Sequence, residues 1–304
     1  MNSSQESTIA TIELRALDEL WFQVAGTVCN LTCHHCFISC SPQNHSFEFL
    51  SFAEVEKALQ ESVGHGVREY YFTGGEPFLN KDLRRMLKRT LEFGPATVLT
   101  NGTVLKRKWL RELYEAEQSS RYSLEFRVSI DGPSAEINDP VRGDGTFVKA
   151  IQGVQLLCEA GFLPIITITQ TWDDSENVRI LAEFRTVLKE HGCDRPRLKI
   201  LPRLKIGAEE NRTEGYQDTE RIVPEMMQGF DRDQLLCHHS RVVTSRGIYV
   251  CPILIESPDA HMGDTLSESL APFAMQHGAC YTCYQYGAIC SNSTLRPEQP
   301  QATS

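Results

Sequence analysis

The chain has 304 residues, of which 41% are hydrophobic and 23% are charged, an ordinary composition for a soluble globular protein. Its net charge of −10 gives no electrostatic support to a nucleic-acid partner or an anionic membrane. Because the sequence has neither a signal-peptide core nor an apolar run of about 20 residues, we expect a cytoplasmic protein.

Segments with strand and helix periodicity alternate from residue 20 to residue 202. Strands are predicted at 20–25, 69–73, 96–99, 124–130, 163–169 and 197–201. Helices are predicted from about 51 and at 82–93, 107–117, 147–160 and 177–190. The pair Ser51 and Glu54 is typical of a capping box at the start of the first helix. Six such repeats predict an α/β fold, a partial (β/α)6 TIM-like barrel with parallel strands and right-handed crossovers.

Three cysteines, Cys29, Cys33 and Cys36, follow the first predicted strand with the spacing Cys-x3-Cys-x2-Cys. Three thiolates on a short loop can hold three corners of a 4Fe–4S cluster, which leaves one iron open because four cysteines are the usual number. A structural zinc ion would need a fourth ligand. Cys40 would close the open iron if it were a ligand, and we interpret it as a bystander.

The spacing of the three cysteines resembles that of the radical S-adenosylmethionine (SAM) enzymes, and the aromatic Phe37 after the third cysteine fits this family. The segment Gly74-Gly75-Glu76-Pro77, after the second predicted strand, resembles the family element that contacts the amino group of SAM. Glycine lets backbone carbonyls approach an ammonium closely, and a nearby carboxylate adds opposite charge. A simple strand-to-helix turn is the alternative for these four residues.

The resemblance implies further contacts with SAM at the ends of later strands. Asn101 would line the SAM pocket, Ser129 would bond the ribose, and Arg142 would pair with the SAM carboxylate. A turn cap for Ser129 and a surface ion pair for Arg142 are the alternatives. The segment 166–169 is expected to pack on adenine.

The family chemistry is the reductive cleavage of SAM at the cluster. It gives methionine and a 5′-deoxyadenosyl radical, which takes a hydrogen atom from the substrate. The resemblance also implies an electron donor such as a flavodoxin or ferredoxin.

A second cysteine group lies near the end of the chain. Residues 247–252 are predicted as the second arm of a hairpin whose turn is 245–247. The group resembles the twitch or shortened SPASM extension of radical SAM enzymes, which holds auxiliary 4Fe–4S clusters. The resemblance implies one auxiliary cluster, with Cys290 as a spare or substitute ligand and four main ligands, Cys237, Cys251, Cys280 and Cys283. A zinc ribbon has the same spacing and stays an alternative.

We expect five parts: a lead-in at 1–19, a radical SAM core at 20–205, a linker or lid at 206–236, an auxiliary-cluster domain at 237–292 and a disordered tail at 293–304. Glu209 and Glu210 in the linker are expected to be solvated. The expected function is the radical SAM oxidation of a small metabolite or a peptide, by dehydrogenation or crosslinking. The alternatives are an iron–sulfur electron carrier or sensor without SAM cleavage, and a zinc-stabilised binding module.

Overall fold

The computed structural model describes residues 9–287 and 289–290. The predicted tail at 293–304 lies outside the described residues. None of the described helices is long and apolar enough to cross a membrane.

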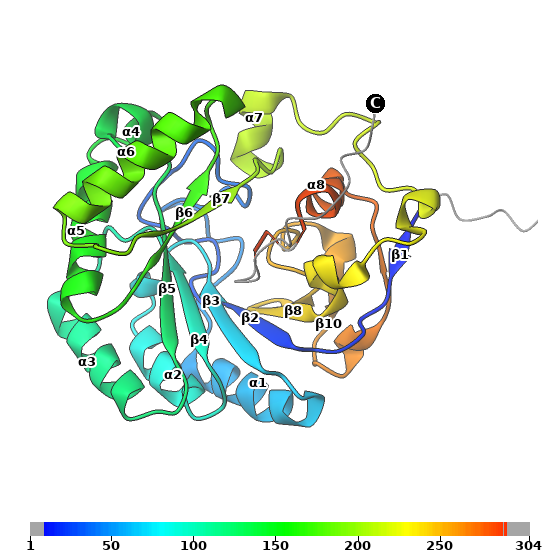
Figure 1. Ribbon diagram of the computed structural model, residues 1–304. Coiled ribbons are helices and arrows are strands. Elements are labelled where there is room, and N and C mark those ends of the chain that lie inside the picture. Colours follow the sequence, from blue (N-terminus) through cyan, green and yellow to red (C-terminus); the bar gives the residue numbers. More distant parts are fainter. Residues whose placement is uncertain (1–8, 288, 291–304) are drawn as a thin grey trace, which may run out of the picture.

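A nine-stranded sheet lies at the centre of the described part of the chain, in the order β10-β9-β8-β2-β3-β4-β5-β6-β7 (Figure 1). The six predicted strands are confirmed as β2 (Glu19–Gln23), β3 (Glu69–Thr73), β4 (Ala96–Thr100), β5 (Leu124–Ser129), β6 (Ile165–Thr169) and β7 (Arg197–Leu201). All six pair in parallel and in sequence order. The predicted fold class, a partial barrel of βα units, is therefore confirmed.

Helices on the outer face of the sheet connect these strands (Figure 1). The predicted helices are α1 (Phe52–His65), α2 (Leu83–Thr90), α3 (Arg107–Gln118), α5 (Thr146–Glu159) and α6 (Asn177–Glu190). The capping box is confirmed, because Ser51 accepts from the backbone of Glu54 and the Glu54 carboxylate accepts from the backbone of Ser51. Helix α4 (Ala135–Arg142) was not predicted, since Pro140 lies inside it and proline disfavours a helix interior.

Successive side chains along each strand point alternately to the side of the sheet that faces the helices and to its inner side. Phe22 and Phe72 are fully buried among the side chains of the helices, in the larger of two apolar clusters. Trp21 and Tyr71 lie on the inner side, where their rings stack with centroids 4.2 Å apart. The inner side, at the carboxyl ends of the strands, is where the barrel can hold a ligand.

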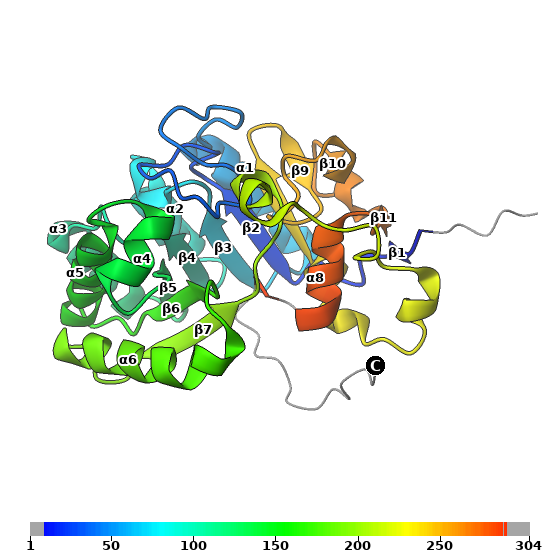
Figure 2. The ribbon, with the colours of Figure 1, turned by 90° about the horizontal axis from the view of Figure 1, so that it is seen from above.

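The cysteine-rich C-terminal segment continues the same sheet (Figure 2). Strand β8 (Ser240–Thr244) pairs in parallel with β2, and β9 (Gly247–Tyr249) and β10 (His261–Gly263) follow in antiparallel pairing. The predicted hairpin is thus present as β8 and β9. Helix α8 (Gly278–Tyr286) was not predicted, and β1 (Thr11–Ile12) pairs with β11 (Phe273–Ala274). The division of the chain into domains stays a prediction.

Several short helices lie in the segment predicted as a linker. They include η3 (Gly207–Glu209), α7 (Glu210–Thr213), η4 (Pro224–Met227) and η5 (Arg232–Gln234); the other short helices are η1 (Pro77–Leu79), η2 (Asp174–Glu176), η6 (Leu236–His238), η7 (Pro258–Ala260) and η8 (Glu268–Leu270). Glu209 is only 1% exposed and pairs with Arg212 at 3.2 Å, so the expectation that it is solvated was wrong, whereas Glu210 is exposed. The backbone N–H of Ala208 donates to the carbonyl of Cys36, which ties this segment to the cysteine loop.

Candidate active site

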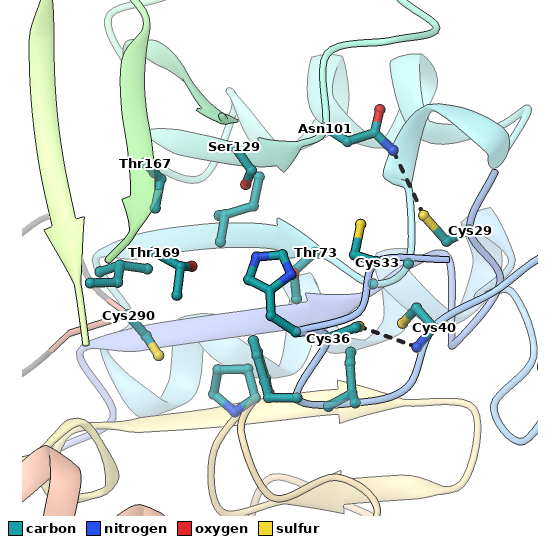
Figure 3. A pocket seen from close by; sticks show the side chains of 18 of the residues that line it. Cys29, Cys33, Cys36, Cys40, Thr73, Asn101, Ser129, Thr167, Thr169 and Cys290 are labelled. Carbon is teal, nitrogen blue, oxygen red and sulfur yellow. Dashed lines mark hydrogen bonds between the residues drawn. The ribbon is translucent and has the colours of Figure 1, made fainter. Parts of the chain in front are cut away.

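The loop between β2 and α1 brings the first three cysteines to one cavity of about 200 Å³ (Figure 3). Cys29, Cys33 and Cys36 all line it. The backbone N–H of Leu31 donates to Cys29 Sγ at 3.4 Å, and that of Cys40 donates to Cys36 Sγ at 3.2 Å. Donors aimed at sulfur favour the thiolate form that ligates metals.

The protein environment treats the three thiols differently. Burial raises the pKa of Cys29 to about 12 and that of Cys33 to about 11. A side-chain hydrogen bond with Cys40 lowers the pKa of Cys36 to about 6. The thiol of Cys40 thus acts on Cys36 at close range, and its role as a bystander to the metal stays a prediction.

The Gly74-Gly75 turn packs directly on the cysteine loop. The backbone N–H of Gly75 donates to the carbonyl of Gly26 at 3.0 Å, and that of Glu76 donates to the carbonyl of Val28 at 3.1 Å. A Cβ on Gly75 would lie 2.0 Å from the Val28 oxygen, so no other residue fits without moving the loop. Both glycines line the cavity, and they also hold the cysteine loop in place.

Glu76 is fully buried beneath this turn, and its carboxylate joins the ends of β3 and β4. It accepts hydrogen bonds from the backbone of Phe78 at 3.0 Å, Thr100 Oγ1 at 2.8 Å and the backbone of Asn101 at 2.8 Å. Burial raises the pKa of Glu76 to about 7, against the effect of these donors. Glu76 and Pro77 are not among the described residues that line the cavity, whereas Gly74 and Gly75 are.

A buried carboxylate that the sequence analysis missed organises the opposite wall. Asp131 accepts from Arg142 Nε at 2.5 Å, from His35 Nε2 at 2.7 Å and from the backbone of Thr169 at 2.7 Å. Burial acts to raise the pKa of Asp131, but the charges of Arg142 and His35 overcome it and hold the pKa below its usual range. Arg142 and His35 line the cavity, so one carboxylate orients both of these side chains there.

The remaining predicted contacts with SAM also lie in the cavity wall. Phe37, Asn101 and Ser129 line it, and Asn101 Nδ2 donates to Cys29 Sγ at 3.7 Å and to Asn30 Oδ1 at 2.9 Å. In the segment 166–169, Thr167 and Thr169 line the cavity, whereas Ile166 and Ile168 are buried in the apolar cluster on the helix side of the sheet. The alternation of isoleucine and threonine along β6 was the signal that could have found them.

The C-terminal cysteines divide between two cavities. A second, smaller cavity beside β8 and α8 is lined by Cys237, Cys251, Cys280 and Cys283. Cys290, which the sequence grouped with them, lines the first cavity instead, where Figure 3 shows its sulfur. Among residues 9–287 and 289–290, no three cysteine, histidine or acidic side chains lie close enough together to hold a single metal ion.

The chemistry of both donor sets fits iron–sulfur clusters. In the first cavity, the cysteine loop presents the thiols of Cys29, Cys33 and Cys36 beside a polar wall with Arg142. Three thiolates from this loop would leave the fourth iron of a cubane open for another ligand. The second has four thiols among apolar side chains, a complete ligand set for a closed cluster. Zinc would require four sulfurs at about 2.3 Å from one ion. The thiols of the second cavity do not lie close enough together for that arrangement.

Comparison with known proteins identifies the family to which the chain belongs. Residues 24–181, which hold the cysteine loop, the Gly74-Gly75 turn and the Asp131 network, match the Radical SAM superfamily. The chain belongs to this superfamily and is therefore a radical SAM enzyme, a class for which a 4Fe–4S cluster and SAM are expected.

The curated relatives catalyse different reactions. The chain is 32% identical over 148 residues to the AdoMet-dependent heme synthase of Oleidesulfovibrio alaskensis (48% of this chain, 37% of the relative). It is 33% identical over 139 residues to a probable GTP 3',8-cyclase of Archaeoglobus fulgidus (45% and 44%) and 29% identical over 169 residues to the mycofactocin maturase MftC of Mycobacterium tuberculosis (54% and 40%). The chain thus matches less than half the length of each of these relatives.

Solved structures share the fold over more of the chain. The structure of anSMEcpe with bound AdoMet has a TM-score of 0.60 at 18% identity and covers 83% of this chain and 79% of its own. Streptococcus suis SuiB bound to the precursor peptide SuiA has a TM-score of 0.62 at 16% identity and covers 85% and 66%. At these identities the similarity shows the fold alone.

Proposed function

We propose that this chain binds a 4Fe–4S cluster through Cys29, Cys33 and Cys36, cleaves SAM reductively and oxidises a peptide or a small molecule with the help of an auxiliary 4Fe–4S cluster. The observation that carries the proposal is the shared cavity, in which three thiols, the Gly74-Gly75 turn and Arg142 face one another. When bound, the two clusters and SAM supply a 5′-deoxyadenosyl radical for hydrogen abstraction and an acceptor for one further electron.

The residues of the cavity would bind and orient SAM. The backbone carbonyls of Gly74 and Gly75 can accept from its ammonium, because no Cβ stands in the way. The guanidinium of Arg142, held through its Nε by Asp131, can pair with its carboxylate. Ser129 would bond the ribose, and Thr167 and Thr169 would lie beside the adenine.

Apolar side chains in the lining of the cavity support its use as a reaction chamber. Trp21, Leu201, Leu204 and Ile289 line it, together with Pro252. Such side chains exclude water, which protects a reactive carbon radical from unwanted reactions. Net oxidation would proceed by loss of one hydrogen atom, one electron and one proton from the substrate.

The four cysteines of the second cavity support the auxiliary cluster. A closed ligand set gives a cluster suited to electron transfer and unsuited to SAM binding. This site lies beside β8, and β8 is bonded to β2, the strand from which the first cysteine loop follows. The two sites are thus connected through one pair of hydrogen-bonded strands.

For the substrate we favour a peptide. The fold is shared with SuiB bound to a precursor peptide and with anSMEcpe bound to a peptide and AdoMet. A small metabolite is the second possibility, and a flavodoxin or ferredoxin is proposed as the electron donor.

Anaerobic reconstitution tests the proposal. The wild-type chain should bind about eight irons, two cubanes' worth, and release 5′-deoxyadenosine with dithionite and SAM. The variant Cys29→Ala/Cys33→Ala/Cys36→Ala should keep about four irons and release no 5′-deoxyadenosine. A wild-type chain that binds iron without cleaving SAM would contradict the proposal, and zinc in the second cavity would contradict its auxiliary-cluster part.

A further inference from the structure

Arg241, on β8, is a buried cation that the proposed chemistry does not yet use. Its side chain is 1% exposed. Nε donates to the carbonyl of Ser269 at 2.7 Å, Nη1 donates to the carbonyls of Cys237 and Ser240 at 2.9 and 2.8 Å, and Nη2 donates to that of Ala271 at 3.3 Å. Backbone carbonyls thus hold the guanidinium rigidly in place.

None of these partners neutralises its charge. Within the described residues, no carboxylate forms an ion pair with Arg241, whereas the buried Arg142 has Asp131. Burying an uncompensated charge costs several kcal/mol, so buried charges in proteins are usually paired. We therefore expect an anionic group close to the Arg241 guanidinium.

The second cavity can supply negative charge close to Arg241, because Cys237, whose carbonyl accepts from the guanidinium, also lines that cavity. Cys237 precedes β8 and Cys251 follows β9, so both ends of the hairpin bring a thiol to this cavity. The hydrogen bond from Arg241 to the Cys237 carbonyl fixes the guanidinium beside the backbone of one predicted ligand.

We propose that Arg241 is the counter-charge of an anionic iron–sulfur cluster in the second cavity and sets the reduction potential of that cluster. The inference rests on the proposed auxiliary cluster and goes further, because it assigns its electrostatic partner. Each one-electron reduction adds one negative charge to the site. A fixed cation stabilises that extra charge, so Arg241 raises the potential at which the site accepts an electron.

Two substitutions separate charge from hydrogen bonding. Arg241→Lys keeps the charge and loses most of the carbonyl contacts, whereas Arg241→Gln loses the charge and keeps a polar donor. Both are made in the full-length Cys29→Ala/Cys33→Ala/Cys36→Ala chain, so that one cluster gives the whole signal. The midpoint potential is measured by anaerobic redox titration followed by electron paramagnetic resonance.

Arg241→Gln should make the midpoint potential of the cluster more negative by at least about 59 mV. For a one-electron couple this shift corresponds to a tenfold change in the reduction equilibrium constant. Arg241→Lys should stay within that margin of the parent. The matched control is Arg111→Gln, which removes the same charge from an arginine that is 75% exposed on α3, across the barrel from β8 (Figure 1). It should leave the potential unchanged.

Equal potentials in the Lys and Gln variants would overturn the inference. If Arg241→Gln folds but does not retain the cluster, retention by Arg241→Lys supports a requirement for charge. Loss of the cluster in both variants would overturn it in favour of a purely structural guanidinium. A parent chain without a second cluster would instead refute the proposed auxiliary site, so the two failures are distinguishable.

Discussion

Asp131 accepts a 2.5 Å hydrogen bond from the Nε of Arg142 inside the wall of the main cavity. The carboxylate is fully buried, and it also accepts from His35, which lies in the cysteine loop between Cys33 and Cys36. One side chain at the end of β5 therefore joins the end of α4 to the loop proposed to carry the cluster. This arrangement makes the geometry of the proposed carboxylate-binding group depend on Asp131.

Asp131→Asn should weaken SAM binding more than it reduces the iron content. The neutral amide keeps the shape of the site but loses the charge that orients Arg142. A hydrogen bond to a charged group contributes about 1.5–3 kcal/mol, so we expect the dissociation constant of SAM to rise about 10- to 100-fold. Equilibrium binding of SAM to the reconstituted protein, together with iron analysis, measures both effects.

Asp139→Asn is the matched control for this prediction. Asp139 accepts from the backbone of Gly145 and Phe147 and holds the start of α5, without touching Arg142 or His35. It should lower stability and leave the affinity for SAM near that of the wild type. Unchanged SAM affinity in Asp131→Asn would show that the ion pair is only structural.

Gly75→Ala should disrupt the cysteine loop. The added methyl group would lie 2.0 Å from the carbonyl oxygen of Val28, and this backbone cannot move without shifting Cys29. We expect the protein to lose about 1–3 kcal/mol of stability, as overpacked sites do, and to bind less iron at the first site. Chemical denaturation and iron analysis of the same preparation test the two effects.

Gly64→Ala provides the contrast. Gly64 lies in α1, and a methyl group added there would have no neighbouring atom within 4 Å, so the substitution should stabilise the chain by roughly 0.5–1 kcal/mol. Iron content should stay at the wild-type level. If both alanine variants bind iron equally well, the close contact at Gly75 does not position the cluster loop.

The strands and helices of the barrel could be predicted from sequence periodicity, because the residues of each element themselves favour that element. The segments at 69–73 and 197–201 match β3 and β7 residue for residue, and the Ser51–Glu54 pair marks the start of α1 within one residue. Helix α4 escaped prediction because Pro140 opposes it locally, and tertiary contacts override that preference. The parallel pairing of β8 with β2 is a long-range contact, which local periodicity does not encode.

The site was predictable only where a motif marked it. Cys29, Gly75 and Arg142 were found by spacing and resemblance, and the structure brings all three to one cavity. In the sequence Asp131 is only part of a turn after a strand, because its importance depends on two partners distant in sequence. Cys290 was grouped by spacing with Cys283, although the two side chains line different cavities.

The stability of the apoprotein should fall as the pH rises from about 5 to 7, in part because of Glu19. Burial raises the pKa of Glu19 from 4.5 to about 7. Within this window the unfolded chain loses a proton that the folded chain keeps, so the folded state becomes less stable as pH rises, and Glu19 adds no further loss above pH 7. Glu19→Gln should remove this dependence and stabilise the protein at pH 8 by on the order of 3 kcal/mol.

Urea unfolding at several pH values measures the effect of Glu19→Gln. The glutamine oxygen can still accept the hydrogen bond from Trp21 Nε1, so packing is retained. Glu115→Gln, at a position that is 71% exposed on α3, should leave the pH dependence of the wild type intact. A pH profile that stays unchanged in Glu19→Gln would mean that the buried carboxyl does not titrate in this window.

Cys290→Ala should keep both clusters, although the sequence grouped Cys290 with the auxiliary ligands. The four cysteines of the second cavity form a complete ligand set, and Cys290 faces the first cavity. We therefore expect about eight irons per chain in Cys290→Ala and about six or fewer in Cys283→Ala, whose cluster loses a ligand. Because the alanine changes the wall of the reaction chamber, turnover should fall while 5′-deoxyadenosine is still released. Iron loss in Cys290→Ala equal to that in Cys283→Ala would restore Cys290 as a ligand of the auxiliary cluster.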